Sequence, residues 1–90
     1  MRVEWDPEKA ISNFRKHGIR FPDAEVALFD PNAMTREDED VEGEQRFISI
    51  GRDVVARIVV VVYTYCGENV RVISARKATR KERRAYEEGI

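Results

Sequence analysis

The sequence predicts an α+β fold, and three observations support that prediction. Residues 5–18 carry the start and stop signals of a helix, and residues 19–31 repeat them in a shorter form. Residues 45–75 contain three consecutive runs rich in β-branched residues, which predict an antiparallel meander. After Ala75 the hydrophobic period changes, which indicates another helix. We therefore expect two N-terminal helices, a mainly antiparallel sheet and a C-terminal helix.

The first helix is marked at both of its ends. Asp6 is suited to cap the N-terminus, Pro7 to occupy the first helical position, and Gly18 to end the helix. The apolar residues between these signals lie three to four positions apart and predict one packed stripe, with the polar residues exposed. The predicted stripe consists of Ala10, Ile11 and Phe14.

The second helix is shorter and leads into a polar region. Pro22 lies near its start, and Asp30 with Pro31 ends it. Residues 32–35, "NAMT", are a candidate edge strand. Residues 36–44, "REDEDVEGE", have no apolar periodicity, so we expect a mobile connection at one rim of the sheet.

Strand signals occupy the rest of the chain up to the last helix. "RVEW" at residues 2–5 predicts a short strand, and the meander consists of "QRFISIG", "ARIVVVVYTY" and "VRVISA", with a turn at residues 66–69. Thr79 and Glu82 have the spacing of a capping box, and Gly89 ends the helix that follows.

Length and composition indicate one small domain spanning residues 1–90. The chain is 42% apolar, which suits a globular fold. Its 37% charged residues exceed the average of about 25% for such domains. These values predict a small core under a strongly ionic surface.

Charge is distributed unevenly along the chain. Basic and acidic residues number 5 and 5 through residue 29, 2 and 7 from residue 30 to 50, and 9 and 5 from residue 51, so the net charges 0, −5 and +4 sum to −1. A sequence pI near 5.9 argues against nucleic-acid binding only if the charges are mixed uniformly. The basic C-terminal part is therefore still a candidate for binding phosphate groups.

Targeting signals and cysteine pairs are not evident in the sequence. Cys66 is the single cysteine and forms no internal disulfide. The N-terminus lacks the apolar region of a signal peptide, and the run from Ile58 to Tyr63 is far shorter than the roughly 20 residues of a membrane helix. These features predict a cytoplasmic protein.

The acidic segment invites a test for metal binding. Asp38, Asp40 and Glu42 fit the opening spacing of an EF-hand calcium loop. The match fails at the twelfth loop position, where Ser49 replaces the required Glu and a strand replaces the exit helix. We assign no metal or other cofactor, and interpret the segment as a solvated loop, with binding of a basic protein as the alternative.

His17 and several arginines are the candidates for chemistry. His17 lies at the end of the first helix, where it serves either as a helix cap or as an acid or base. Arg52 and Arg57 flank a predicted turn between two strands. Strict alternation along the last strand puts Arg71 and Arg76 on opposite faces unless the strand bulges between them.

The junction between the last strand and the last helix is densely basic. Six of the nine residues 76–84 are Arg or Lys, and one is acidic. Such a cluster either binds phosphate groups or forms a solvated helix surface. Arg83 and Arg84, followed by Glu87 and Glu88, favour the second interpretation for the later part of the helix.

The chain resembles the BrnT family over nearly its whole length. The resemblance is carried by "EWDPEKAISNFRKHGIRFPDA", "GEQRFISIGR" and "VRVISARKATRKERRAYEEG", and most specifically by W-D-x-x-K-x-x-x-N-x-x-K-H-G and I-S-A-R-x-A-T-R-x-E-R-x-x-Y. It implies a RelE-like fold with the two N-terminal helices against the sheet. It also implies a ribonuclease toxin of a type II toxin-antitoxin pair, neutralised by a ribbon-helix-helix BrnA antitoxin that contacts operator DNA.

The family pattern also suggests which residues act. Cleavage without a metal needs a base, an acid and a cation for the charge that develops on the phosphate. Carried onto this sequence, the resemblance leads us to expect Arg57 and Arg76 to hold the phosphate and His17 to transfer a proton. The residues expected to guide the RNA backbone are Lys9, Arg52, Lys77, Arg80 and Lys81. A non-catalytic module that binds RNA or the antitoxin is the alternative function.

Overall fold

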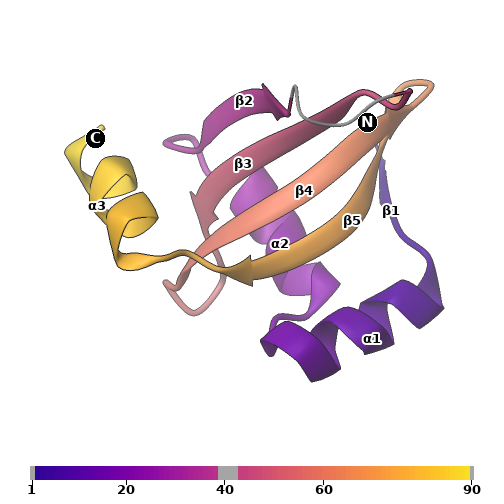
Figure 1. Ribbon diagram of the computed structural model, residues 1–90, viewed down its shortest axis with the longest axis horizontal. Helices are drawn as coiled ribbons and strands as arrows, with labels where there is room; N and C mark the ends of the chain where they lie inside the picture. Colours follow the sequence, from indigo (N-terminus) through magenta and orange to yellow (C-terminus); the bar gives the residue numbers. More distant parts are fainter. Residues whose placement is uncertain (1, 39–42, 90) are drawn as a thin grey trace.

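The computed structural model describes residues 2–38 and 43–89. Within these residues the chain forms three helices and five strands (Figure 1). In chain order these elements are β1 (Val3–Glu4), α1 (Pro7–His17), α2 (Phe21–Leu28), β2 (Met34–Asp38), β3 (Arg46–Arg52), β4 (Ile58–Cys66), β5 (Asn69–Lys77) and α3 (Arg80–Glu88). The expected α+β fold is confirmed.

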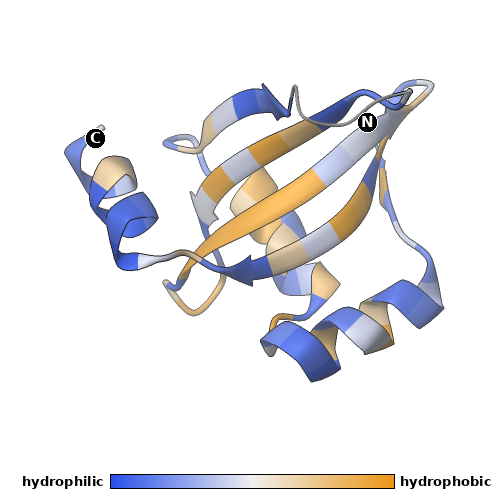
Figure 2. Ribbon diagram, viewed as in Figure 1, coloured by the Kyte–Doolittle hydropathy of each residue, from blue (hydrophilic) through white to orange (hydrophobic). Residues whose placement is uncertain are grey.

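The five strands form one mixed sheet in the order β1-β5-β4-β3-β2. β3, β4 and β5 are the predicted meander, and each is antiparallel to its neighbour. β1 adds a short parallel pair at the other side of β5, and β2 is antiparallel to β3 at the opposite edge. In Figure 2 the strongly apolar segments lie along β3, β4 and β5, whereas α1 and α3 are mostly hydrophilic.

The edge strand β2 is longer and more charged than the sequence suggested. It extends from Met34 to Asp38, so residues 36–38 belong to a strand rather than to the expected connection. An edge strand can be exposed to water on both faces, so its sequence need not alternate between apolar and polar residues. The sequence prediction depended on that alternation. The rest of the acidic segment, residues 39–42, lies outside the described residues.

Helices α1 and α2 cover one face of the sheet, and the core lies between them and the strands. α2 crosses behind β3, β4 and β5 in Figure 1, and α1 lies along the β5 side. Gly51 lets α2 approach β3 closely, because a Cβ at this position would lie 2.2 Å from the backbone oxygen of Ala27. The fully buried core residues include Ile19, Phe21, Ala24, Ala27, Val59, Val61 and Ala75.

Local signals set the ends of α1 as expected. The Asp6 side chain accepts a hydrogen bond from the backbone of Glu8, and Gly18 closes the helix at a left-handed φ of 72°. The predicted packing stripe is wrong in detail, because Ile11 is 55% exposed and Phe14 is also exposed. Asn13, expected in water, is instead 8% exposed and faces the sheet.

The Asn13 side chain binds the free edge of β5 beyond the end of β1. Its amide nitrogen donates to the backbone oxygens of Ile19 at 3.1 Å and Ala75 at 2.9 Å. Its oxygen accepts from the backbone nitrogen of Ala75 at 3.0 Å. An amide side chain thus replaces the missing neighbouring strand at this position, which satisfies buried backbone groups that the sheet leaves unpaired.

A bulge in β5 changes which side chains share a face. Tyr63 pairs with Val72 and Val62 pairs with Ser74, so Ile73 is an extra residue in β5. Because of that extra residue, Arg71 opposite Thr64 and Arg76 opposite Val60 lie on the same face. Strict alternation would have put the two arginines on opposite faces, and the bulge is the reason that it does not hold here.

Helix α3 lies beyond one end of the sheet (Figure 1). The expected capping box is present, with Thr79 and Glu82 each bonding to the backbone of the other. Tyr86 is 1% exposed, and its hydroxyl donates to the Asp30 carboxylate in the connection before β2. No helix in the described ranges is long and apolar enough to cross a membrane.

Candidate functional site

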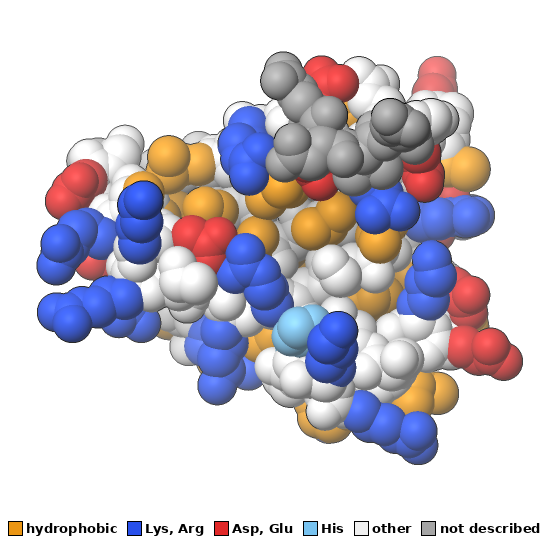
Figure 3. Space-filling model, in the orientation of Figure 1, with side chains coloured by type: hydrophobic (Ala, Val, Ile, Leu, Met, Phe, Trp, Pro, Cys, Tyr) orange, Lys and Arg blue, Asp and Glu red, His pale blue; other side chains and the backbone are white. Residues whose placement is uncertain are grey.

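The face of the sheet away from α1 and α2 bears two of the candidate cations, Arg52 and Arg76. Phe47, Ser49 and Gly51 pair with the core side of β4, so the residues between them point the other way. The centre of this open face is apolar and consists of Ile48, Ile50, Val60 and Val62. Figure 3 shows apolar side chains in the middle of the face and basic side chains around them.

Arg76 projects from this open face and is held by a carboxylate. Its two terminal nitrogens donate to the two oxygens of Glu82 at 2.7 and 2.9 Å. The hydrogen bond from Arg76 holds the pKa of Glu82 at about 2, and the same bond raises the pKa of Arg76. The Arg76 side chain remains 41% exposed, so a second anion still has access to it.

Arg57 lies on the opposite side of the sheet. Its Nε donates to the buried carboxylate of Asp53 at 2.7 Å, and a terminal nitrogen lies 3.4 Å from Asp23 in α2. Asp53 also accepts hydrogen bonds from the backbone nitrogens of Val55 and Arg57, so these contacts close the β3–β4 turn. The structure therefore does not bring Arg57 and Arg76 together.

His17 and Lys9 lie on the side of α1 that faces β5. They are each four residues from Asn13, so the three side chains lie along one side of the helix. Asn13 binds Ala75, the neighbour of Arg76, and His17 is one turn further along. Figure 3 shows the chain's one histidine over α1, below the sheet and next to basic side chains. His17 and Arg76 therefore lie on neighbouring elements, each close along its own element to the contact between Asn13 and Ala75.

The other predicted RNA-binding residues surround the junction of β5 and α3. Arg52, at the end of β3, lies with its guanidinium carbon 5.9 Å from the centre of the Tyr86 ring. Lys77 pairs with the core residue Val59 and so points to the opposite side from Arg76. Arg80 and Lys81 are exposed in the first turn of α3.

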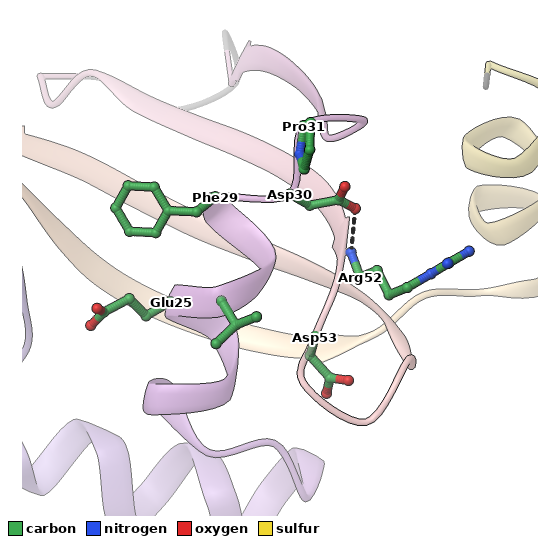
Figure 4. Close-up of a pocket in the computed structure, with 7 residues that line it drawn as sticks. Glu25, Phe29, Asp30, Pro31, Arg52 and Asp53 are labelled. Carbon is green, nitrogen blue, oxygen red and sulfur yellow. Dashed lines mark hydrogen bonds between the residues drawn. The ribbon is translucent and has the colours of Figure 1, made fainter.

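A hollow on the helix side of the sheet has a mainly acidic polar lining, unlike the basic surroundings of the open face. Its polar lining comprises the carboxylates of Glu25, Asp30 and Asp53 together with Arg52 (Figure 4). Burial raises the pKa of Asp30, but hydrogen bonds from Tyr86 and from the backbone of Asn32 and Arg52 outweigh it and lower the pKa. Figure 4 shows the Arg52 side chain running toward α3 and out of this hollow. An acidic hollow of this kind repels phosphate groups.

Two important contacts are not expected from the sequence. Glu82 was assigned only to the capping box, although a carboxylate directed back at the helix start also reaches Arg76. The contacts of Asp53 with Arg57 could have been suspected from their spacing of four residues across a turn. Within residues 2–38 and 43–89 no group of three or more His, Cys, Asp or Glu residues is arranged to hold a metal ion.

A small α+β protein with arginine, lysine and histidine around one sheet face belongs to the class of proteins suited to act on a polyanion such as RNA. The family described as "Ribonuclease toxin, BrnT, of type II toxin-antitoxin system" matches residues 5–82. Because the match spans most of the chain, this protein belongs to the BrnT family of ribonuclease toxins.

A solved structure supports the assignment. The chain is similar to the crystal structure of the Brucella abortus ribonuclease toxin BrnT, with 30% sequence identity and a TM-score of 0.69. The similarity covers 89% of this chain and 99% of the Brucella chain. Comparison with curated protein sequences gave no significant match.

Proposed function

We propose that residues 1–90 act as one toxin domain that cleaves RNA internally, without a metal ion, at the seam between α1 and β5. The observation that carries the proposal is the position of Arg76, which projects from the open face next to Ala75, the residue to which Asn13 of α1 is bonded one turn before His17. Family membership supplies the reaction class. The geometry of the described residues supports the proposed location.

The cleavage step requires little from the protein beyond charge and proton transfer. The 2′-hydroxyl of the RNA attacks the neighbouring phosphorus, and the 5′-oxygen leaves. Arg76 is suited to stabilise the charge on the phosphate oxygens, because its planar guanidinium matches them and stays protonated. His17 is the candidate to transfer a proton to or from one of the two sugar oxygens.

Glu82 and Arg57 require revised roles in this mechanism. Glu82 holds Arg76 through both terminal nitrogens, so a phosphate must either share Arg76 with that carboxylate or displace the carboxylate. Arg57 is bonded to Asp53 and lies on the side of α2. We therefore assign Arg57 to the stability of the β3–β4 turn and leave Arg76 as the phosphate-binding arginine.

Cleavage of a labelled RNA by purified Arg76→Ala and Arg57→Ala tests this assignment. We expect Arg76→Ala to lower the cleavage rate by about 100-fold, the typical effect of removing one charge-stabilising donor. Arg57→Ala should mainly lower the melting temperature. Arg71→Ala is the matched control, because Arg71 shares the face of Arg76 but lies at the far end of β5. Full activity of folded Arg76→Ala would refute the proposed site.

Metal independence has its own test. Cleavage by the wild-type protein should proceed at an unchanged rate in EDTA, because Arg76 and His17 would supply the charge and the proton transfer. Loss of activity in EDTA and its recovery with Mg²⁺ would contradict the proposal. A denaturing gel reads the RNA length directly in both conditions.

The contact between Arg76 and Glu82 favours one alternative, a module that binds RNA without cleaving it. An arginine that is already paired with a carboxylate stabilises the negative charge of a transition state less than an unpaired arginine does. In that case the protein would shift labelled RNA on a native gel while its length on a denaturing gel stayed the same. The two gels separate the alternatives in one experiment.

The partner and the setting are also proposals. A type II toxin requires a protein antitoxin, and we infer a BrnA-type partner with a ribbon-helix-helix segment that makes the contacts to operator DNA. The site of action would be the cytoplasm, where RNA is available. A small reading frame for such a protein beside the toxin gene, and its co-purification with the toxin, would support the pair.

A further inference from the structure

The outer side of α3 carries a second group of cations that the cleavage site does not use. Arg80, Lys81 and Arg84 line one hollow of about 510 Å³, and among residues 2–38 and 43–89 no other residue takes part in its lining. At 3.6 residues per turn these three positions fall on one side of the helix. The opposite side holds Glu82 and Tyr86, which bind Arg76 and Asp30. The basic side therefore points away from the body of the protein.

The charges of this group are not neutralised by neighbouring carboxylates. Among the described residues, none of the three side chains forms an ion pair or a hydrogen bond. The sequence suggested that Arg84 belongs to an ordinary ionic surface with Glu87 and Glu88, and the structure contains no such pair. Three cations on one side of a helix repel one another, and a bound anion would relieve that repulsion.

The position of the group indicates which anion it would bind. Arg80 and Arg84 are separated by about 6 Å along the helix axis. That separation is comparable to the distance between neighbouring phosphates of an extended strand. The chain from Arg76 through Lys77 leads directly into this helix. In Figure 3 basic side chains lie over α3 and between that helix and the histidine.

We propose that Arg80, Lys81 and Arg84 form a second phosphate-binding site, which holds the RNA strand beyond the bond cleaved at Arg76. The site rests on the proposed ribonuclease function and extends it to substrate length. A long single strand reaches both Arg76 and the outer side of α3. We expect a trinucleotide to occupy the Arg76 site alone. The protein therefore binds long RNA more tightly than short RNA, through phosphates and without regard to base sequence.

Binding of two RNA lengths by the double variant Lys81→Ala/Arg84→Ala tests the second site. The probes are a trinucleotide and a strand of about 15 nucleotides, both 2′-O-methylated so that they cannot be cleaved. For the long strand we expect Kd to rise about tenfold at moderate salt and the slope of log K against log salt to fall by about 1.4, or 0.7 per phosphate contact. Trinucleotide binding should stay unchanged.

Arg83→Ala is the matched control for the single variant Arg84→Ala, because each removes one arginine charge from the same helix and only Arg84 lines the hollow. An equal loss of long-strand binding in Arg83→Ala would overturn the proposal, because net charge would explain both results. An equal loss for both probe lengths in the double variant would also overturn it. Circular dichroism checks folding, and alanine favours the helix at each position.

Cleavage assays separate this inference from the proposed function. If the wild-type protein cleaves no RNA but the double variant still loses only long-strand binding, the catalytic proposal fails and the second site stands. If the variant cleaves and binds long RNA normally but no longer binds the antitoxin, α3 is a protein interface. That result would refute the second phosphate site.

Discussion

Replacing Asn13 with alanine should destabilise the fold more than any exposed substitution on α1. The asparagine amide donates to the backbone oxygens of Ile19 and Ala75 and accepts from the Ala75 nitrogen. Alanine leaves all three backbone groups without this partner at a buried position. The loss concerns the contact that attaches α1 to β5.

The expected magnitude follows from those three contacts. Each lost hydrogen bond at a buried group costs roughly 1 kcal/mol, which gives about 3 kcal/mol for the three. Alanine returns about 0.5 kcal/mol because it favours the helix more than asparagine does. The net loss of about 2.5 kcal/mol corresponds to a fall in melting temperature of about 10–20 °C for a domain of this size.

Thermal unfolding followed by circular dichroism measures the effect. Ser12→Ala is the control, because Ser12 is the exposed neighbour on the same helix. We expect its melting temperature to stay close to that of the wild type. A decrease of less than about 3 °C in Asn13→Ala would show that water replaces the amide at little cost, and the argument for this contact would be wrong.

Three further substitutions have defined outcomes. Tyr86→Phe removes the hydroxyl that donates to Asp30 and should cost about 1–2 kcal/mol in urea unfolding, and an unchanged midpoint would contradict the role of that bond. Glu82→Gln should lower the melting temperature at neutral pH, but the difference from the wild type should shrink as pH falls from 4.5 to about 2. The reason is that a carboxylate whose pKa is lowered in the folded protein stabilises the fold at pH values above its ordinary pKa, and this stabilisation is lost as the carboxylate is protonated. A constant difference across that range would mean that charge is not involved. Gly51→Ala places a Cβ against the Ala27 oxygen and should cost more than about 2 kcal/mol, and wild-type stability would show that α2 moves away freely.

Local chemistry explains the parts of the fold that the sequence predicts well. The ends of α1 and α3 depend on caps within three or four residues, so Asp6, Gly18 and Thr79 are recognisable without knowledge of the fold. The meander follows from β-branched runs joined by short turns. These signals act along the chain and need no partner from a distant segment.

Contacts between distant segments explain the parts that the sequence predicts poorly. Asn13 looks like a solvent residue until Ala75, 62 positions away, presents unpaired backbone groups to it. Residues 36–38, the charged end of β2, look like a connection because their charges are tolerated in a strand only at a sheet edge beside β3. The sequence identifies Arg57 and Arg76 as candidates in the same way, but it does not identify the carboxylates that these arginines bind in the folded protein.

The extra residue in β5 decides which side chains in the second half of the strand reach the open face. Regular pairing that placed Ile73 opposite Val62 would exchange the two faces for every later residue of the strand. Arg76 would then point into the apolar core and Ala75 toward the open face. Deleting Ile73 would instead let Val72 and Ser74 pair in regular succession with Tyr63 and Val62, and Arg76 would stay on the open face.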